Sequence, residues 1–534
     1  MKTSRLYLVV TLAALAAAVS CTKDFADRNT NHEQATREML SYDNLSTGSA
    51  FAQMTRNVLP TYQQGEEEYG SSNYQIIEDL AGNIFAGYTG AINSAWRYNN
   101  QYDITAGSWY KAMFNDAYVR LMAAWNQLDA WRDAQPEVAA IGDIMKVAGM
   151  HRVTDTYGPV PYSGIRAGEL FQTYDSQKDI YTAFFSELDA AIAVLSDYVA
   201  SNPGAKLVAD YDNVYRGDVT SWIKFANTLR LRLALRVVYA DASLARAQAE
   251  AALSNVNGLL SKKSDVAACN KPSAGAWEYP LYVIQYSFND GAAGATIEAY
   301  MNGYSDPRLS SYFTKGSDGL YHGVRNGINV TADYKNSSLL SKVNCTNGDA
   351  LVWMQPAEAW FLRAEYELRW GSEAAARECY EAGIRTSFET AGASGADAYV
   401  ADAVSTPGSY TDVVVSGNSV AAALSDIPVA WLEGGSFERH LEQVITQKYL
   451  AIFPCGQEAW SEFRRTGYPR IIPVAVNRSG GLIDSEVQIR RLNYPDTEYS
   501  TNGEAVAAGV ALLNSESASG AGDNGGTHLW WDKK

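Results

Sequence analysis

The sequence has 534 residues, of which 47% are hydrophobic and 19% are charged, and its formal net charge is −17. This composition is typical of a globular protein, and the acidity argues against a nucleic-acid partner and against adhesion to anionic lipid headgroups. Most aromatic residues are of the kinds that carry a polar atom, with 34 tyrosines and 13 tryptophans against 15 phenylalanines. Such rings pack in a core or stack on the faces of ligands.

The N-terminus has the layout of a secretory signal peptide over residues 1–20. Lys2 and Arg5 precede an apolar run, Leu6 to Val19, that is shorter than the roughly twenty residues that cross a bilayer. The small residues before Cys21 resemble a bacterial lipobox, in which the cysteine becomes the acylated N-terminus and anchors the protein. The "CTKDF" that follows resembles the export tags of surface lipoproteins in Bacteroidota. We predict lipidation at Cys21 and a surface-exposed position on the outer membrane, with an ordinary secreted protein as the alternative.

The other cysteines and the five histidines form no motif for metal binding or catalysis. The sequence contains no C-x-x-C, H-E-x-x-H or G-x-S-x-G pattern and no glycine-rich phosphate loop. We therefore expect neither an enzyme nor a cofactor. A carboxylate pair for glycoside hydrolysis has no sequence signature, so a helical glycosidase or lyase stays an alternative. The residues concerned are Cys269, Cys345, Cys379, Cys455, His32, His151, His322, His440 and His528.

Amphipathic helices are predicted along much of the chain, because apolar residues recur at helical spacing. The clearest is 356–370, with Pro356 in its first turn and Gly371 just past its end. With 373–389 it would form an antiparallel hairpin that approaches the pattern of a tetratricopeptide unit. The predicted helices are 33–58, 73–86, 109–133, 137–155, 177–199, 219–240, 243–256, 356–370, 373–389 and 436–453. Further hairpins are proposed for 109–133 with 137–155, 177–199 with 219–240, and 436–453 with 455–465.

Long irregular stretches separate these helices. They are rich in Gly, Ser, Asn, Asp and Tyr, and loops of this length are usually functional or contain short strands. The Gly/Ser/Ala-rich segment 503–527 is expected to be poorly ordered. We predict a mainly α fold in which one helical domain, 21–534, carries loop-rich insertions at about 257–355 and 391–435, with recognition on the loops. The irregular stretches are 60–72, 87–108, 200–218, 257–355, 391–435 and 466–534.

Several segments resemble a known family when they are taken in order. They are "PAEAWFLRAEYELRWGSEAAARECYEAGIRTSF" at 356–388, "ITQKYLAIFPCGQEAWSEFRRTGYP" at 445–469, "IRRLNYP" at 489–495 and "LWWD" at 529–532. "DTYGPVPYS" at 155–163 and "YDSQKDIYTAFFSELDAAI" at 174–192 fit as well. Together with the lipobox, they resemble the SusD/RagB family of outer-membrane nutrient-binding lipoproteins.

The resemblance implies a fold of about four tetratricopeptide-like units with an inserted, irregular ligand-binding face. It implies a protein of polysaccharide utilisation that captures oligosaccharides, or peptides in some branches, without catalysis. Such proteins cover a TonB-dependent, SusC-like transporter and pass the nutrient to it. A pure tetratricopeptide interaction protein that binds peptides in a groove is a further alternative.

The family segments themselves are predicted to serve the fold and not the ligand. Arg363 and Glu367 lie four residues apart on one helix and are expected to pair. Trp460 and Phe463 are expected to be buried. The two arginines that follow them, Arg464 and Arg465, are expected to hydrogen-bond the carbonyls of the last helical turn.

Ligand binding is predicted at "WRYNNQYDITAGSWY", residues 96–110, where aromatic and polar residues interleave without the alternation of a strand. The candidate residues are Trp96, Tyr98, Asn99, Asn100 and Tyr102, with Arg97 and Asp103 nearby. Flat rings would stack on sugar faces, and the polar groups would bond hydroxyls.

A second cluster is "WEYPLYVIQYSFN", residues 277–289, where Pro280 and flanking glycines favour an exposed edge. Its candidate residues are Trp277, Tyr279 and Tyr282, followed by Tyr286. We expect Trp96, Tyr98 and Trp277 to be the stacking rings. A third stretch, 66–74, is proposed to line the same opening.

Three acidic residues within "DYDNVYRGD" at 210–218 could supply oxygens to a structural calcium ion. They are Asp210, Asp212 and Asp218. The stretch lacks the glycine placement of an EF-hand loop, so an Asp-rich turn is the favoured interpretation.

Overall fold

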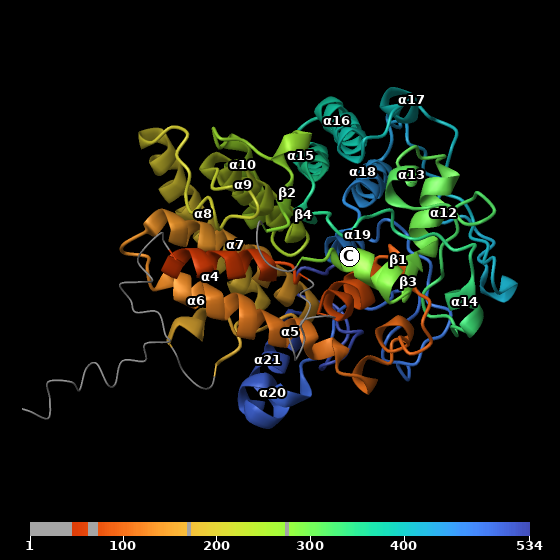
Figure 1. Ribbon diagram of the computed structural model, residues 1–534, viewed down its shortest axis with the longest axis horizontal. Coiled ribbons are helices and arrows are strands. Elements are labelled where there is room, and N and C mark those ends of the chain that lie inside the picture. Colours follow the sequence, from red (N-terminus) through yellow and green to blue (C-terminus); the bar gives the residue numbers. More distant parts are fainter. Residues whose placement is uncertain (1–44, 62–72, 168–171, 273–276) are drawn as a thin grey trace, which may run out of the picture. The chain divides into compact units, whose positions relative to one another are not determined.

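The computed structural model describes residues 45–61, 73–167, 172–272 and 277–534 (Figure 1). Helices make up most of the regular structure, which confirms the predicted mainly α class. The helices are α4 (Leu45–Asn57), α5 (Ala112–Asp116), α6 (Ala123–Asp129), α7 (Pro136–Tyr157), α8 (Gln177–Ser201), α9 (Val219–Arg236), α10 (Ala242–Ser254), α11 (Pro280–Tyr282), α12 (Ala295–Gly303), α13 (Leu309–Tyr312), α14 (Ala332–Asn336), α15 (Pro356–Trp370), α16 (Glu373–Ala391), α17 (Ala396–Val400), α18 (Phe437–Ala451), α19 (Gly456–Thr466), α20 (Asp496–Thr501) and α21 (Gly503–Glu516).

The long helices pack on one another as hairpins. Helix α7 packs against α8, α8 against α9, and α9 against α10, while α15 pairs with α16. The predicted hairpin of 356–370 with 373–389 is therefore confirmed, and 177–199 does pack on 219–240. The predicted unit of 436–453 with 455–465 is wrong in its partners, because α18 packs mainly against α15 and α16 and α19 packs against residues 75–83.

Local sequence explains where these helices begin. A serine or aspartate side chain stands at the N-cap of five long helices and accepts a hydrogen bond from the backbone N–H three residues later. Such caps satisfy N–H groups that the helix itself leaves unpaired. Helix α15 begins instead with Pro356 and ends before Gly371, as predicted. The five capping residues are Ser176, Asp218, Asp241, Ser372 and Ser436.

Two predicted helices are interrupted by wider turns. The helix predicted at 73–86 contains a π-helical segment, Gln75–Asn83. The one predicted at 109–133 divides into a 3-10 turn, α5, a second π-helical segment (Ala117–Met122) and α6. Helix α6 and the second π-helical segment then pack on α7 as the predicted hairpin requires, and α5 contacts α7 through Phe114 and Tyr157. Residues 33–44 of the first predicted helix lie outside the described residues.

Two small antiparallel sheets join segments that are far apart in the sequence. Strand β1 (Thr89–Ala91) pairs with β3 (Gly291–Ala293), and Gly90 lies opposite Ala292. Strand β2 (Ala267–Cys269) pairs with β4 (Leu351–Met354) with an irregular register. The predicted insertion 257–355 thus contains short strands and helices, and β1–β3 fixes it beside the start of the loop at 96–110.

The C-terminal region corrects a prediction. Residues 503–516, expected to be poorly ordered, form helix α21. Its buried face includes Val506 and Leu513, and a Cβ atom at Gly509 would lie 2.6 Å from the ring of Tyr174. The glycine here allows close packing and does not mark a loop.

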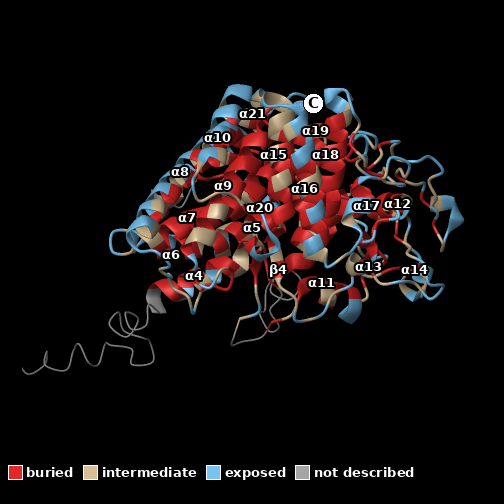
Figure 2. Cartoon of the chain, turned by 90° about the horizontal axis from the view of Figure 1, so that it is seen from above, coloured by how far each residue is buried: buried red, intermediate tan, exposed pale blue. Residues whose placement is uncertain are grey.

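The buried residues lie on the faces where the hairpins pack against one another, while the outer faces of α8 and α10 are largely exposed (Figure 2). The core is rich in large rings, among them Trp125, Trp222, Trp460 and Trp531. None of the helices in the described residues has the length and apolar character of a membrane span.

Candidate functional site

The loop 96–110 presents three rings that touch one another. The centroid of the Trp109 ring lies 4.9 Å from that of Trp96 and 4.8 Å from that of Tyr98, both in edge-to-face arrangements. All three side chains are partly exposed. We call Trp96, Tyr98 and Trp109 the aromatic cluster. Edge-to-face contact holds the rings rigidly and keeps part of their surface open to a ligand.

The polar residues between these rings lie beneath them and hold the loop. Asn99 donates to the carbonyl of Leu80 at 2.9 Å, and the Asn100 Oδ1 accepts the backbone N–H of Gly327 at 2.6 Å. Tyr102, at a positive φ of 59°, is also buried. These three predicted ligand residues therefore form the base of the loop, and their contact with a ligand stays a prediction.

A charged pair lies at the edge of the aromatic cluster. The exposed Arg97 guanidinium carbon is 5.3 Å from the centre of the Tyr98 ring, and its Nε is 4.0 Å from Asp103. A cation over a ring face stabilises the ring in place, although exposure to water keeps the gain small. The cluster thus offers ring surface, one guanidinium and one carboxylate to a polar, ring-faced ligand.

The second predicted segment, 277–289, divides into a buried and an exposed part. Trp277 and Tyr279 are 7% and 6% exposed, and the Trp277 Nε1–H donates to the carbonyl of Asp349 at 3.2 Å. For these two rings the expected exposed edge is wrong, because they pack into the core. Tyr282 and Tyr286 stack with centroids 5.1 Å apart, and Tyr286 is 36% exposed. We call Tyr282 and Tyr286 the tyrosine pair.

Asp290, which directly follows the second segment, bonds the part of the chain just before the first segment. The Asp290 carbonyl accepts the N–H of Ile92 at 3.0 Å, and its carboxylate accepts from Asn93 at 2.8 Å and from Lys335 at 3.1 Å. Among the described rings, no direct contact joins the aromatic cluster to the tyrosine pair. Of the third predicted stretch, residues 66–72 lie outside the described residues, while Tyr74 is buried.

Sequence reasoning missed Trp109 as a member of the site. The residue stands at the end of the aromatic-rich stretch, but it was assigned to the start of a helix. The structure places it in a separate 3-10 turn, Trp109–Lys111, that folds back against Trp96. The glycine two residues earlier was the available signal, because a Cβ atom at Gly107 would lie 3.2 Å from the ring of Tyr98.

The segment 445–469 is structural, as predicted, but its charges do more than cap a helix. Arg236 of α9 bonds Glu458 and Glu462 of α19, and Lys448 lies 3.0 Å from Glu458. Arg465 bonds Glu365 and Glu462, each at 2.6 Å. All of these side chains are nearly inaccessible to solvent. We call Arg232, Arg236, Glu358, Glu365, Lys448, Glu458, Glu462 and Arg465 the buried ion network.

The surrounding cations set the charge state of the network. Burial alone would raise the pKa of Glu458, but Arg236, Lys448 and Arg232 lower it to about 2. The pKa of Glu462 is lowered further by Arg465 and Lys448, against the same burial. The carboxylates are therefore charged and paired at neutral pH, as buried ions must be. This arrangement serves the fold, because its atoms bond one another and not an open surface.

Two of the predicted arginine contacts need correction. Arg464 donates at 2.6 Å and 2.7 Å to the carbonyls of Asp155 and Arg490. Within its own helix it bonds the Ser461 hydroxyl at 2.9 Å and, at 3.4 Å, the Trp460 carbonyl. Arg363 does not pair with Glu367 but lies over the Trp360 ring at 4.6 Å. The burial of Trp460 and Phe463 is confirmed.

The Asp-rich turn at 210–218 uses its carboxylates within the fold. Asp212 is fully buried and accepts N–H bonds from Val214, Gly217 and the Trp222 indole. Asp218 caps α9 by accepting from Ser221 at 2.7 Å. The donors already on Asp212 leave it poorly suited to calcium, whose ligands are oxygen lone pairs.

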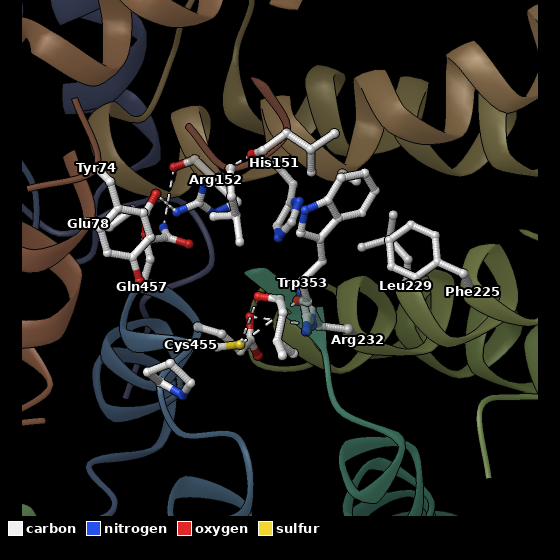
Figure 3. Close-up of a pocket in the computed structure, with 16 residues that line it drawn as sticks. Tyr74, Glu78, His151, Arg152, Phe225, Leu229, Arg232, Trp353, Cys455 and Gln457 are labelled. Carbon is white, nitrogen blue, oxygen red and sulfur yellow. Dashed lines mark hydrogen bonds and ion pairs between the residues drawn. The ribbon is translucent and has the colours of Figure 1, made fainter. Parts of the chain in front are cut away.

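A small cavity of about 30 Å³ lies between α7, α9, β4 and the turn before α19 (Figure 3). It is far smaller than the several hundred Å³ typical of sites for drug-sized ligands. A saccharide therefore has no room there.

Comparison with known proteins places this architecture in a family. The family model described as SusD-like, "Susd and RagB outer membrane lipoprotein", matches residues 27–532. A SusD homologue from Bacteroides uniformis has 36% identity and a TM-score of 0.84, with 92% of this chain and 99% of the homologue covered. A chitin-binding SusD homologue from Flavobacterium johnsoniae has 35% identity and a TM-score of 0.84, with 91% and 98% covered. No curated protein matched the chain.

These solved structures are tetratricopeptide-like helical folds, so the likeness confirms the predicted fold class. The family is one of substrate-binding proteins and not of enzymes, and its description places it at the outer membrane as a lipoprotein. The match covers almost the whole chain and includes every segment that suggested the resemblance except the lipobox, which precedes it. The chain therefore belongs to the SusD-like family of outer membrane lipoproteins.

Proposed function

We propose that this protein captures oligosaccharides at the cell surface and delivers them to a TonB-dependent, SusC-like transporter in the outer membrane. The observation that carries the proposal is the aromatic cluster, three mutually packed and partly exposed rings on a loop fixed by buried hydrogen bonds. Rigid rings bind sugar faces at little cost in conformational entropy.

The relatives support a glycan as the first ligand to test. The Flavobacterium johnsoniae homologue binds chitin and shares 35% identity with this chain. Chitin is a neutral polymer whose rings have apolar faces, and the aromatic cluster offers ring surface of the matching kind. We therefore propose a neutral glycan, with chitin oligosaccharides as the first probes.

The N-terminus supports the proposed location. Cys21 lies outside the described residues, and its lipidation stays part of the proposal. Lipid on Cys21 would hold the body at the membrane, where a transporter can accept the ligand. Expression in a Bacteroidota host with a labelled fatty acid should label the protein, and Cys21→Ala should abolish both the label and membrane fractionation. A soluble wild-type protein without label would overturn the anchor.

Binding to a polysaccharide panel tests the ligand site. We expect Trp96→Ala, Tyr98→Ala and Trp109→Ala each to lower affinity at least about tenfold, which corresponds to about 1.4 kcal/mol. The matched control is Trp370→Ala, which removes another partly exposed tryptophan at the end of α15. A separate Trp277→Ala arm tests whether the buried ring contributes.

Three outcomes would overturn the proposal. Binding of peptides without any glycan would favour the peptide-binding branch. Release of shorter products from glycans on incubation would make the protein an enzyme. Unchanged affinity in all three cluster variants, with each variant folded, would move the ligand site elsewhere.

A further inference from the structure

The charged side chains that line the small cavity shown in Figure 3 are already paired. Arg152 bonds Glu78, and Arg232 bonds Glu358 with its Nε and Nη2 at 2.7 and 2.6 Å. Glu458, another lining residue, bonds Arg236 and Lys448. Because each charge already faces an opposite charge, an ion entering the cavity would have no counter-charge left to compensate its own desolvation.

His151 offers this cavity a hydrogen-bond acceptor. Its Nδ1 lies 3.1 Å from the carbonyl oxygen of Val147, and a carbonyl can only accept, so Nδ1 carries the proton. Burial and the neighbouring cations Arg232 and Arg152 lower the pKa of His151 well below its usual value, against the opposing effect of Glu458. The ring is therefore neutral, and Nε2 holds a free lone pair. Within the described residues Nε2 has no hydrogen-bond partner, and the side chain is 2% exposed.

Trp353 offers the complementary group. Its indole extends from β4 towards α7, where His151 lies (Figure 3). The Nε1–H can only donate, the side chain is 5% exposed, and no acceptor for it exists in the part of the chain that the structure describes. One buried donor and one buried acceptor thus line the same cavity without bonding each other.

We propose that this cavity is a binding site for internal water, in which one molecule donates to His151 Nε2 and accepts from Trp353 Nε1–H. Water is neutral, so it needs no counter-charge from the paired side chains. It is both a donor and an acceptor, so one molecule can bond both open groups. A cavity needs about 10–15 Å³ of such volume for each water, so 30 Å³ has room for two. The residues Tyr74 and Gln457 supply further polar partners in the lining.

The proposed water site lies where the family segment meets two other parts of the fold. Cys455, Gln457 and Glu458 come from the start of α19, Trp353 from β4 of the insertion, and His151 from α7 of the hairpins. A bridging water would join these three parts where His151 Nε2 and Trp353 Nε1–H are left unpaired within the described residues. Substituting an apolar group would not satisfy either atom.

Three measurements on the full mature protein test the proposal. A crystal structure at about 1.5 Å resolution should show a density peak within 3.2 Å of both His151 Nε2 and Trp353 Nε1. In protein labelled with ¹⁵N-tryptophan, the Trp353 indole proton should show a cross-peak to water, and its resonance is identified by its loss in Trp353→Phe. A ¹⁵N-histidine spectrum should show His151 neutral, with the proton on Nδ1.

An empty cavity, a protein side chain filling it, or an anomalous peak of chloride in its place would each overturn the inference. Protonation of both His151 nitrogens at neutral pH would do so as well. If Trp353→Phe fails to fold, the peak in the wild-type crystal and the histidine spectrum still decide the matter.

Discussion

The buried ion network and the loop 96–110 are both dense in polar and aromatic side chains, yet they place them in opposite ways. In the network every charge meets a partner inside the protein, as Arg236 does with Glu458 and Glu462. In the loop the amides lie beneath, and the rings of the aromatic cluster reach the surface. The family segment 445–469 thus serves the packing of the protein, whereas a ligand would meet a few rings of the loop.

Low pH should destabilise the buried ion network far more than the loop 96–110. Glu365, Glu458, Glu462 and Asp532 all have a folded-state pKa below the ordinary value, because buried arginine or lysine groups face them. Their stabilising contribution is complete above the unfolded-state pKa of about 4.3 and is lost as pH falls through the folded value, about 2 for Glu458. We expect the free energy of unfolding to fall steeply between about pH 5 and pH 2.

Asp79 has the opposite sign, as do Asp155, Glu298 and Glu516, whose pKa values burial also raises. Burial raises the pKa of Asp79 to about 6, so this group favours the folded state more as pH falls through 6. Urea titrations from pH 7 to pH 3 should show a maximum of stability near pH 5 to 6 and then the steep loss, and Glu458→Gln should flatten that loss. A stability that does not change down to pH 3 would contradict the charged, paired state of the network.

Removing one cation should break the network while leaving the loop intact. Arg236→Ala leaves the carboxylates of Glu458 and Glu462 partly uncompensated in a fully buried setting. We expect a loss of about 3–5 kcal/mol in the free energy of unfolding, measured by denaturant titration. Arg246→Ala is the matched control, because its pair with Glu250 lies on the exposed face of α10 and should matter little. A loss in Arg236→Ala no larger than in the control would mean that the network is not a stability element.

The helices show how far sequence reasoning reaches. Helix α15 was predicted with its bounds because apolar spacing, Pro356 and Gly371 all agree. Helix α21 is not predicted, because its glycines and serines indicate a loop when the sequence is considered alone. There the local pattern is weak, and the packing of Gly509 against Tyr174, which is distant in sequence, decides the conformation.

The candidate site shows what sequence reasoning does not predict. Composition alone pointed to residues 96–110, but it gave no means to separate Trp96 and Tyr98, which reach the surface, from Asn99 and Asn100, which do not. Likewise, the charges of α19 have the spacing of a solvated helix face, and their burial depends on α9 and α15. Both distinctions depend on tertiary packing, so a single sequence carries no local signal for them.

A buried amide of the loop should connect stability to binding. Asn100→Ala removes the acceptor of the Gly327 N–H at a position that is 3% exposed. An unpaired buried donor costs about 1–3 kcal/mol, so we expect a loss of that size in the free energy of unfolding. Glycan affinity should fall as well, because the rings above lose their support.

The control is Asn202→Ala, whose side chain bonds the Tyr198 carbonyl on an exposed surface. Its stability and affinity should stay close to those of the wild type. If Asn100→Ala lost stability but kept full glycan affinity, the base of the loop would not position the aromatic cluster.

The smallest effect is expected at the tyrosine pair, and it tests whether those rings share the ligand. Tyr286→Phe removes only the hydroxyl that donates to the carbonyl of Val343 at 2.8 Å and keeps the ring stacked on Tyr282. We expect a loss of about 0.5–1.5 kcal/mol in stability. Glycan affinity should be unchanged in Tyr286→Phe and lower in Tyr286→Ala if the ring face contacts the ligand. Equal affinity in both variants would confine the ligand to the aromatic cluster, since the ring itself would then be dispensable.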